Sequence, residues 1–159
     1  MVGLIYKEKK MRRIFAGLLI GSVALTTAAM AADSYMVIPK ASQQFKPGPG
    51  NLYSQQLLLN HKNSQANITI REKNGQAEQH ADWEDHIFIL DGEVTMVLGG
   101  AVENGKTTGP GETRGDSIKG GKNFVLHAQD YIYVPVNTPH QMLVAAGKSV
   151  RYAVVKTHP

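Results

Sequence analysis

Hydrophobic residues along the chain alternate with polar ones in short runs, and this spacing predicts β-strands. A strand is expected where about four to eight residues rich in branched and aromatic side chains lie between turn-forming residues. Runs of this kind lie at residues 52–59, 66–72, 85–91, 93–98, 124–128, 131–134, 141–145 and 149–156. No stretch shows the helical periodicity of about 3.6 residues. Short strands joined by close turns predict an all-β barrel or sandwich.

The alternation is clearest in residues 85–91. Odd-numbered positions share one face of an extended strand there, and even-numbered positions share the other. Both faces carry apolar residues, so the pattern alone leaves open which face is inward. Asp91 and Gly92 form a dipeptide typical of tight turns, so we expect a turn between this strand and the next one at 93–98.

The first 31 residues have the three parts of a secretory signal peptide. A basic stretch ends at Arg13, an uncharged run follows at residues 14–29, and small residues occupy positions 29 and 31. The run is shorter than the roughly 20 residues that span a bilayer. We therefore expect cleavage after Ala31 and a periplasmic or secreted protein. An uncleaved membrane anchor is the alternative, and Met11 would itself be a conventional signal start.

The charges divide unequally at the same point. Residues 1–31 hold five of the 17 Lys and Arg residues and one of the 13 Asp and Glu residues, which leaves 12 of each sign in residues 32–159. This nearly neutral remainder gives no support for nucleic-acid binding. The length of residues 32–159 suits one domain with a single core. After cleavage of the signal peptide we expect no stable membrane association. The chain has no cysteine, so no disulfide stabilises the fold.

Candidate metal ligands cluster just before the clearest strand. Glu78 and His80 are separated by one residue, so both point to the same face of an extended strand and could share one ion. The spacing Glu78-x-His80-x4-Asp85-x6-Gly92 resembles the first motif of the cupins, His-x-His-x3 or 4-Glu-x6-Gly. Glu78 and Asp85 thus stand where the family has His and Glu, and a carboxylate can ligate a metal as an imidazole can.

A second stretch resembles the other cupin motif, Gly-x5-Pro-x-Gly-x2-His-x3-Asn. Pro135, Asn137 and His140 fall in its Pro, second Gly and His positions. Gln129 replaces the first glycine and Val144 replaces the final Asn. Asn tolerates the left-handed conformation that glycine serves in such turns better than other residues do.

The resemblance covers nearly all of the chain after residue 35, and it selects one architecture. It implies a cupin double-stranded β-helix, a jelly-roll-like barrel, for residues 32–159. It also implies one divalent transition metal, with Fe, Mn, Ni, Zn and Cu not separable from the sequence. The implied ligands are Glu78, His80, Asp85 and His140.

Two further features have competing interpretations. His80, His86 and His140 would make a three-histidine site, but His86 must point outward if its neighbour Asp85 points into the barrel. Residues 99–122 form a long glycine-rich segment that joins the two motifs, and we expect a loop there. Its Arg114 would either clamp an anionic group of a substrate or remain solvated.

The family resemblance leaves the reaction open, because fold does not decide function. We expect a metal-dependent enzyme acting on an unidentified small organic molecule, with residues 99–122 restricting solvent access. The alternative is a non-catalytic periplasmic module that binds a small molecule and has a structural metal or none. Small cupins commonly pair through their sheets, so we expect a homodimer. The sequence has no Gly-x-Ser-x-Gly elbow and no phosphate-binding glycine motif.

Overall fold

The computed structural model describes residues 37–48, 50, 52–61 and 63–159. The predicted signal peptide and its cleavage position lie outside these residues. All described residues belong to the second of the two compact units of the chain, Val37–Pro159. None of them forms a helix with the length and apolarity that a membrane crossing requires.

The regular secondary structure of the described residues is β-strand apart from one short 3-10 helix, which confirms the predicted all-β class. The one helix among them is a single 3-10 turn, η1 (Lys40–Ser42). The strands are β1 (Lys46–Gly48), β2 (Leu52–His61), β3 (Ser64–Arg71), β4 (Ala77–His80), β5 (Glu84–Leu98), β6 (Ala101–Glu103), β7 (Lys106–Gly109), β8 (Glu112–Gly115), β9 (Ser117–Lys119), β10 (Lys122–His127), β11 (Tyr131–Val134), β12 (His140–Leu143) and β13 (Val150–Thr157).

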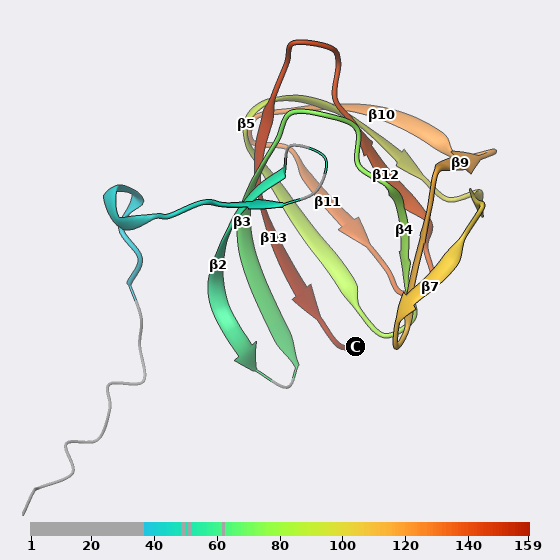
Figure 1. Cartoon of the computed structure of the whole chain (residues 1–159), viewed down its shortest axis with the longest axis horizontal. Helices are drawn as coiled ribbons and strands as arrows, with labels where there is room; N and C mark the ends of the chain where they lie inside the picture. Colours follow the sequence, from blue (N-terminus) through green and yellow to red (C-terminus); the bar gives the residue numbers. More distant parts are fainter. Residues whose placement is uncertain (1–36, 49, 51, 62) are drawn as a thin grey trace, which may run out of the picture. The chain divides into compact units, whose positions relative to one another are not determined.

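Strand β5 organises the barrel because its two halves pair with different neighbours. Its first half lies between β13 and β11, and its second half lies between β10 and β12, all antiparallel. The path β1-β2-β3-β13-β5-β12-β4-β8-β7 therefore curls around at β5, as Figure 1 shows. Strands β6 and β9 form a separate pair.

The tight turn expected at Asp91 and Gly92 is wrong, because β5 continues through both residues. Gly92 has φ +81°, and the pairing with β13 shifts register between Arg151 and Tyr152. A Cβ at Gly92 would come within 2.3 Å of the Ser149 carbonyl oxygen. The glycine thus supplies a left-handed residue at a bulge and permits close backbone approach, where the sequence suggested a reversal of the chain.

The long loop expected at residues 99–122 is also corrected. This segment contains the four short strands β6 to β9. Strand β8 pairs with both β4 and β7, so the segment extends the sheet that carries the first motif. Its strands are only three or four residues long and are separated by glycines, too short for an alternation pattern to be visible.

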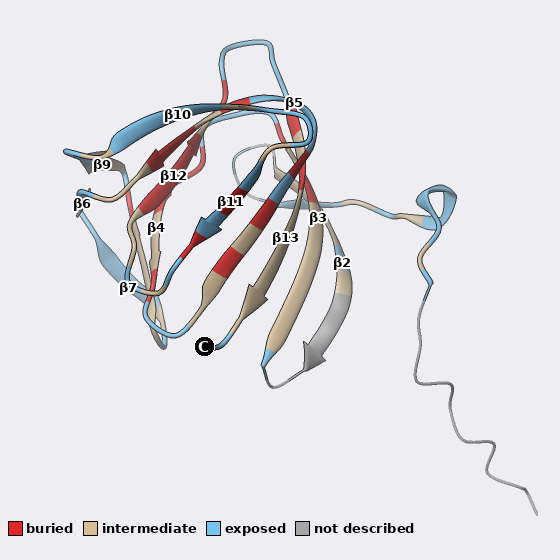
Figure 2. Cartoon of the chain, turned by 180° about the vertical axis from the view of Figure 1, so that it is seen from behind, coloured by how far each residue is buried: buried red, intermediate tan, exposed pale blue. Residues whose placement is uncertain are grey.

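The core lies between the two halves of the curled sheet, where Figure 2 shows buried residues concentrated on β5, β11 and β12. Its apolar members are Ile87, Ile89, Val94, Met96, Ile132, Val134, Met142, Val144, Val150 and Tyr152. On β5 the inward positions alternate as predicted, with Asp85, Ile87 and Ile89 buried and Phe88 and Leu90 exposed. The same alternation turns polar residues of β3 and β13 toward the interior.

Candidate metal centre

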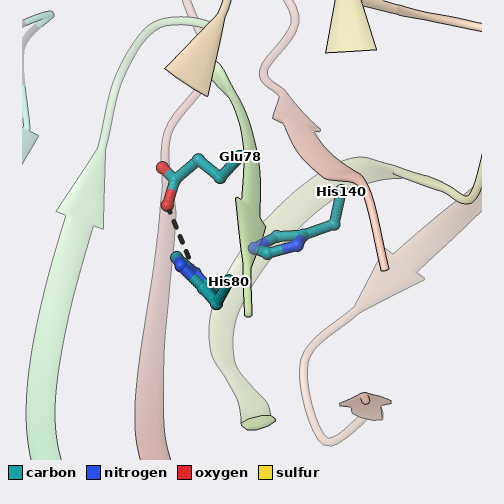
Figure 3. A group of neighbouring side chains, drawn as sticks. All are labelled: Glu78, His80 and His140. Atoms are coloured by element: carbon teal, nitrogen blue, oxygen red, sulfur yellow. Dashed lines mark ion pairs between the residues drawn. The ribbon is translucent and has the colours of Figure 1, made fainter. Parts of the chain in front are cut away.

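Three of the predicted ligand residues converge from two adjacent strands. Glu78 and His80 lie two residues apart on β4, and His140 begins β12 directly opposite Glu78 in the register. Each offers one donor atom to a group whose atoms all lie within 4.8 Å of one another. Figure 3 shows the three side chains turned toward a common point. The predicted shared face of Glu78 and His80 is therefore present.

Asp85, the fourth predicted residue, approaches the same point from β5. Its Oδ2 atom lies 3.6 Å from Nε2 of His80 and 3.5 Å from Nε2 of His140. The Oε2 atom of Glu78 lies 3.7 Å from Nε2 of His80. Donor atoms about 2.1 Å from one tetrahedral ion are roughly 3.4 Å apart. The separations of the two Nε2 atoms from Asp85 are close to this value, but the group whose donor atoms all lie within 4.8 Å of one another comprises Glu78, His80 and His140 without Asp85.

Hydrogen bonds at the far side of each imidazole fix which nitrogen faces the centre. Nδ1 of His80 lies 2.8 Å from Oε2 of Glu112, and Nδ1 of His140 lies 3.0 Å from the Thr138 carbonyl oxygen. Both partners only accept hydrogen bonds, so each Nδ1 carries the proton. In the neutral imidazoles the Nε2 lone pairs then face the centre, which is the arrangement of metal-ligating histidines.

The second motif is tied to the first through its turn. Asn137 has φ +59° and Gln129 has φ +80°, so both substitutes for motif glycines adopt left-handed backbone conformations. The Asn137 amide donates a hydrogen bond of 2.6 Å to the His80 carbonyl oxygen. This contact sets the separation between the chain around His80 and the turn that precedes His140.

Lys156, which the sequence analysis did not single out, reaches the same centre. It is the register partner of Asp85 on β13. Its Nζ lies 2.6 Å from Nε2 of His80 and 3.0 Å from Oδ1 of Asp85. The ammonium therefore contacts two of the four donor groups, and an ion bound by all four would have to displace it. Lys156 belongs to neither cupin-like motif. In the sequence, only its position in the two-residue alternation of the last strand indicates that its side chain points inward.

The charge states of two buried ligand candidates, Asp85 and His140, depend on each other. Burial acts to raise the pKa of Asp85, but the neighbouring His140 and His80 side chains and the charge of Lys156 outweigh it and hold the pKa well below its usual range. Burial acts to lower the pKa of His140, but its bonds to Asp85 and the Thr138 carbonyl raise that pKa overall. Asp85 thus remains an anion inside the barrel.

Arg114 is engaged by carboxylates of the same centre, so neither interpretation from the sequence describes it fully. Its Nη1 lies 2.8 Å from Oε1 of Glu78, and its Nη2 lies 3.8 Å from Oε2 of Glu112. Pairing of β8 with β4 places Arg114 opposite Glu78 and Glu112 opposite His80. Arg114 orients Glu78, and Glu112 orients His80. Neither role was visible in the sequence, because β8 lay inside the segment interpreted as a loop.

Three further histidines, His86, His127 and His158, lie outside the centre. His86 points away from the barrel interior, as strand parity predicted, and its Nδ1 lies 2.7 Å from the Tyr131 hydroxyl. The three-histidine alternative is therefore not formed. His127 is exposed beside Glu93, and His158 stacks on Trp83 with ring centroids 3.7 Å apart.

A cavity of about 720 Å³ opens beside the centre. Glu78, Asp85, His140 and Lys156 line part of it, and other residues of β2, β3, β5, β8, β12 and β13 and of the segment 74–76 also line it. This volume is large enough for a small organic molecule. A ligand in it would lie directly against Glu78, Asp85 and His140, three of the four predicted metal ligands.

Comparison with known proteins supports the architecture. No family model and no curated protein matches the chain. A predicted oxalate decarboxylase from Thermotoga maritima is similar in structure, with a TM-score of 0.60 and 12% identity over 78% of this chain and 100% of that one. An RmlC-like cupin from Shewanella frigidimarina has a TM-score of 0.56 and 15% identity over 79% and 93% of the two chains.

A third similar structure is that of HppE with iron(II). Its TM-score is 0.55 and its identity 15%, over 80% of this chain and 62% of that one. At such low identities the likeness establishes the fold, and function has to be argued from the site. Together with the curled antiparallel sheet, these similarities show that the chain adopts the cupin double-stranded β-helix.

Proposed function

We propose that the chain is a metal-dependent enzyme that acts on a small organic molecule in the barrel cavity. The observation that carries this proposal is the pair of imidazoles whose Nε2 atoms face Asp85 at 3.6 and 3.5 Å, with each Nδ1 proton held by a separate acceptor. A bound divalent metal would supply a Lewis acid with coordination positions open to substrate. The similarity to HppE with iron(II) shows that this fold houses such an ion in another protein.

The residues of this chain would hold that ion as follows. His80 and His140 provide neutral imidazole nitrogens, and Glu78 and Asp85 provide carboxylate oxygens. Glu112 and the Thr138 carbonyl keep the imidazoles in the required tautomer. The walls of the cavity reduce contact with bulk water, which strengthens electrostatic interactions with a substrate. Ligand chemistry leaves Fe, Mn, Ni, Zn and Cu as candidates.

Metal content tests the proposal directly. The purified chain should contain about one equivalent of a transition metal by elemental analysis, and a variant with both His80→Ala and His140→Ala should contain almost none. His127→Ala is the matched control, because His127 is exposed and outside the centre. Equal metal in the wild type and the double variant would refute the proposal. Turnover by the metal-loaded wild type is then measured on a panel of small acids, sugars and phenols.

One observation favours a second candidate, a non-catalytic binding module. The Lys156 ammonium already contacts His80 and Asp85, so the centre has a cation of its own. A small molecule would then bind in the cavity with a structural metal or none. Ligand binding that persists after treatment with a chelator, with no product formed, would favour this candidate over the enzyme.

We also propose export and self-association. The charged, apolar and small-residue segments of residues 1–31 support cleavage after Ala31 and a periplasmic or secreted location. Exposed Phe88 and Tyr131 on β5 and β11, whose ring centroids lie 4.9 Å apart, support a homodimer through this apolar face. N-terminal sequencing of protein from the producing cell tests the first proposal. A monomeric mass in solution would contradict the second.

A further inference from the structure

Arg71 is a buried cation at the end of β3, in the wall of the cavity described above. The residue is 9% exposed, and it lines the same cavity as Asp85 and His140. Its inward direction follows from the alternation of β3, on which Asn67 and Thr69 also line the cavity. It lies outside both cupin-like motifs.

Among the described residues, no carboxylate forms an ion pair with this guanidinium. The nearby carboxylates of the cavity are already engaged, Glu78 by Arg114 and Asp85 by Lys156. The buried Nε of Arg71 has no hydrogen-bond partner within the described part of the chain. Burial of a cation without a counter-ion is costly, so such groups are normally paired with an anion. An anion bound in the cavity would supply this partner.

The surroundings hold the guanidinium in place and still leave it open to the cavity. Tyr152 is the register partner of Thr69 on β3, and the Arg71 charge acts to lower the pKa of its hydroxyl against the larger effect of burial. A Cβ on Gly75 would lie 2.8 Å from Nη1 of Arg71, so the absence of a side chain there makes room for the guanidinium. Gly75 itself is fixed, because its amide donates to Met142 and its carbonyl accepts from Gln141.

The charges along the cavity favour an anion. Three cationic side chains line it, those of Arg71, Arg114 and Lys156, against the two carboxylates of Glu78 and Asp85. A divalent metal held by the four predicted ligands would add further positive charge. A planar guanidinium pairs with a carboxylate through two parallel hydrogen bonds. We infer that Arg71 binds a carboxylate group of the small molecule that occupies this cavity.

This inference narrows the substrate class to small organic acids. Its catalytic meaning rests on the proposed metal-dependent function, but the binding step itself does not require the metal. Arg71 takes the role of anion clamp that the sequence analysis considered for Arg114. Arg71 would hold the acid at one part of the wall while the rest of the molecule lies against the candidate metal centre.

The test compares carboxylates with their neutral amides on chelator-treated protein. Benzoate, succinate and oxalate are titrated beside benzamide, succinamide and oxamide by isothermal calorimetry. We expect the wild type to bind at least one acid about tenfold or more tightly than its amide, as charge-assisted hydrogen bonds imply. Arg71→Met should remove this preference. Arg71→Lys should retain part of it, because the charge remains and the planar fork is lost.

Matched controls separate the alternatives. Arg151→Gln removes an arginine that bonds Gln43 outside the cavity, and it should leave the preference unchanged. If Arg71→Met retains the preference and Lys156→Met removes it, the inference is overturned. If Arg71→Met lowers the melting temperature strongly and no acid is preferred by the wild type, Arg71 is structural and the inference is also overturned. Loss of metal in the histidine variants without loss of acid binding would leave the inference intact.

Discussion

The Nζ atom of Lys156 lies 2.6 Å from Nε2 of His80. The ammonium thus competes with a metal ion for a nitrogen lone pair that Glu112 directs into the barrel. Substitution of Lys156 by Met keeps much of the side-chain length and removes this competitor. We expect the variant to bind Zn²⁺ or Mn²⁺ about tenfold more tightly, corresponding to roughly 1.4 kcal/mol.

Calorimetric titration of the chelator-treated protein measures this change. Lys148→Met is the control, because Lys148 lies in the exposed turn before β13. Unchanged affinity in Lys156→Met would show that the ammonium does not compete for the site.

Glu112 should influence metal affinity without ligating the ion. Its carboxylate accepts a hydrogen bond from the Nδ1–H group of His80 and so sets the direction in which Nε2 points. We expect Glu112→Ala to weaken metal binding by about tenfold to a hundredfold, as for other partners of ligating histidines. Glu93→Ala, on the outer surface beside His127, provides the comparison. Similar losses in the two variants would argue for a general charge effect.

The Asp85 and His140 pair should make the stability of the metal-free protein depend on pH. The lowered pKa of Asp85 gives a contribution that is present above its unfolded value of about 3.9 and is lost as pH falls further. The raised pKa of His140 gives a contribution that is fully present below its unfolded value of about 6.5 and is lost as pH rises through its folded value. Both contributions are present near pH 5, a window of about 3.9 to 6.5 set by the two unfolded values.

Asp85→Asn tests this window. Removal of one member of a buried ion pair costs about 3 kcal/mol or more, so urea unfolding near pH 5 should show a deficit of that order in the variant. The deficit should shrink toward pH 2 and toward alkaline pH. A deficit that is constant with pH would contradict the ionic account and favour a packing effect.

Gly92 should tolerate no side chain. Its φ of +81° disfavours other residues, and a Cβ would also meet the Ser149 carbonyl oxygen at 2.3 Å. We expect Gly92→Ala to lower the free energy of unfolding by about 3 kcal/mol. Gly147 is the matched control, since its φ is +73° and a Cβ added there would have no atom within 4 Å. Gly147→Ala should therefore cost only about 1 kcal/mol. Equal costs would show that the backbone approach at Gly92 can relax.

The sequence predicted those parts of the site that depend on local alternation. The resemblance to the cupins implies that Asp85 points inward, and the two-residue period of a strand then turns His86 outward, as the structure shows. Asn137 has the left-handed conformation expected of it. Lys156 and Glu112 could not be predicted. They reach His80 through pairing with strands distant in the sequence, and register between distant strands leaves no local pattern.

The same limit explains the errors in the fold. Asp91 and Gly92 have the composition of a hairpin turn, and only the pairing with β13 shows that they form a bulge within one strand. Strands β6 to β9 are too short to show alternation. The sequence did not predict a role for Arg71, because an inward arginine in a strand cannot be told from a solvated one by sequence alone. Its lack of a carboxylate partner among the described residues is seen only in the structure, where the cavity carboxylates pair with Arg114 and Lys156.

The double membership of β5 has a consequence for how the barrel opens. Each half of this strand is hydrogen-bonded on both sides, to β11 and β13 and to β10 and β12. Each β5 amide bonds to one neighbour only, so separation of a single neighbour releases some of the amides, and the full set is released to solvent only when the neighbours on both sides come apart. Amide hydrogen exchange in β5 should therefore report global unfolding, whereas β1 and β7, at the ends of the strand path, should exchange by local fraying.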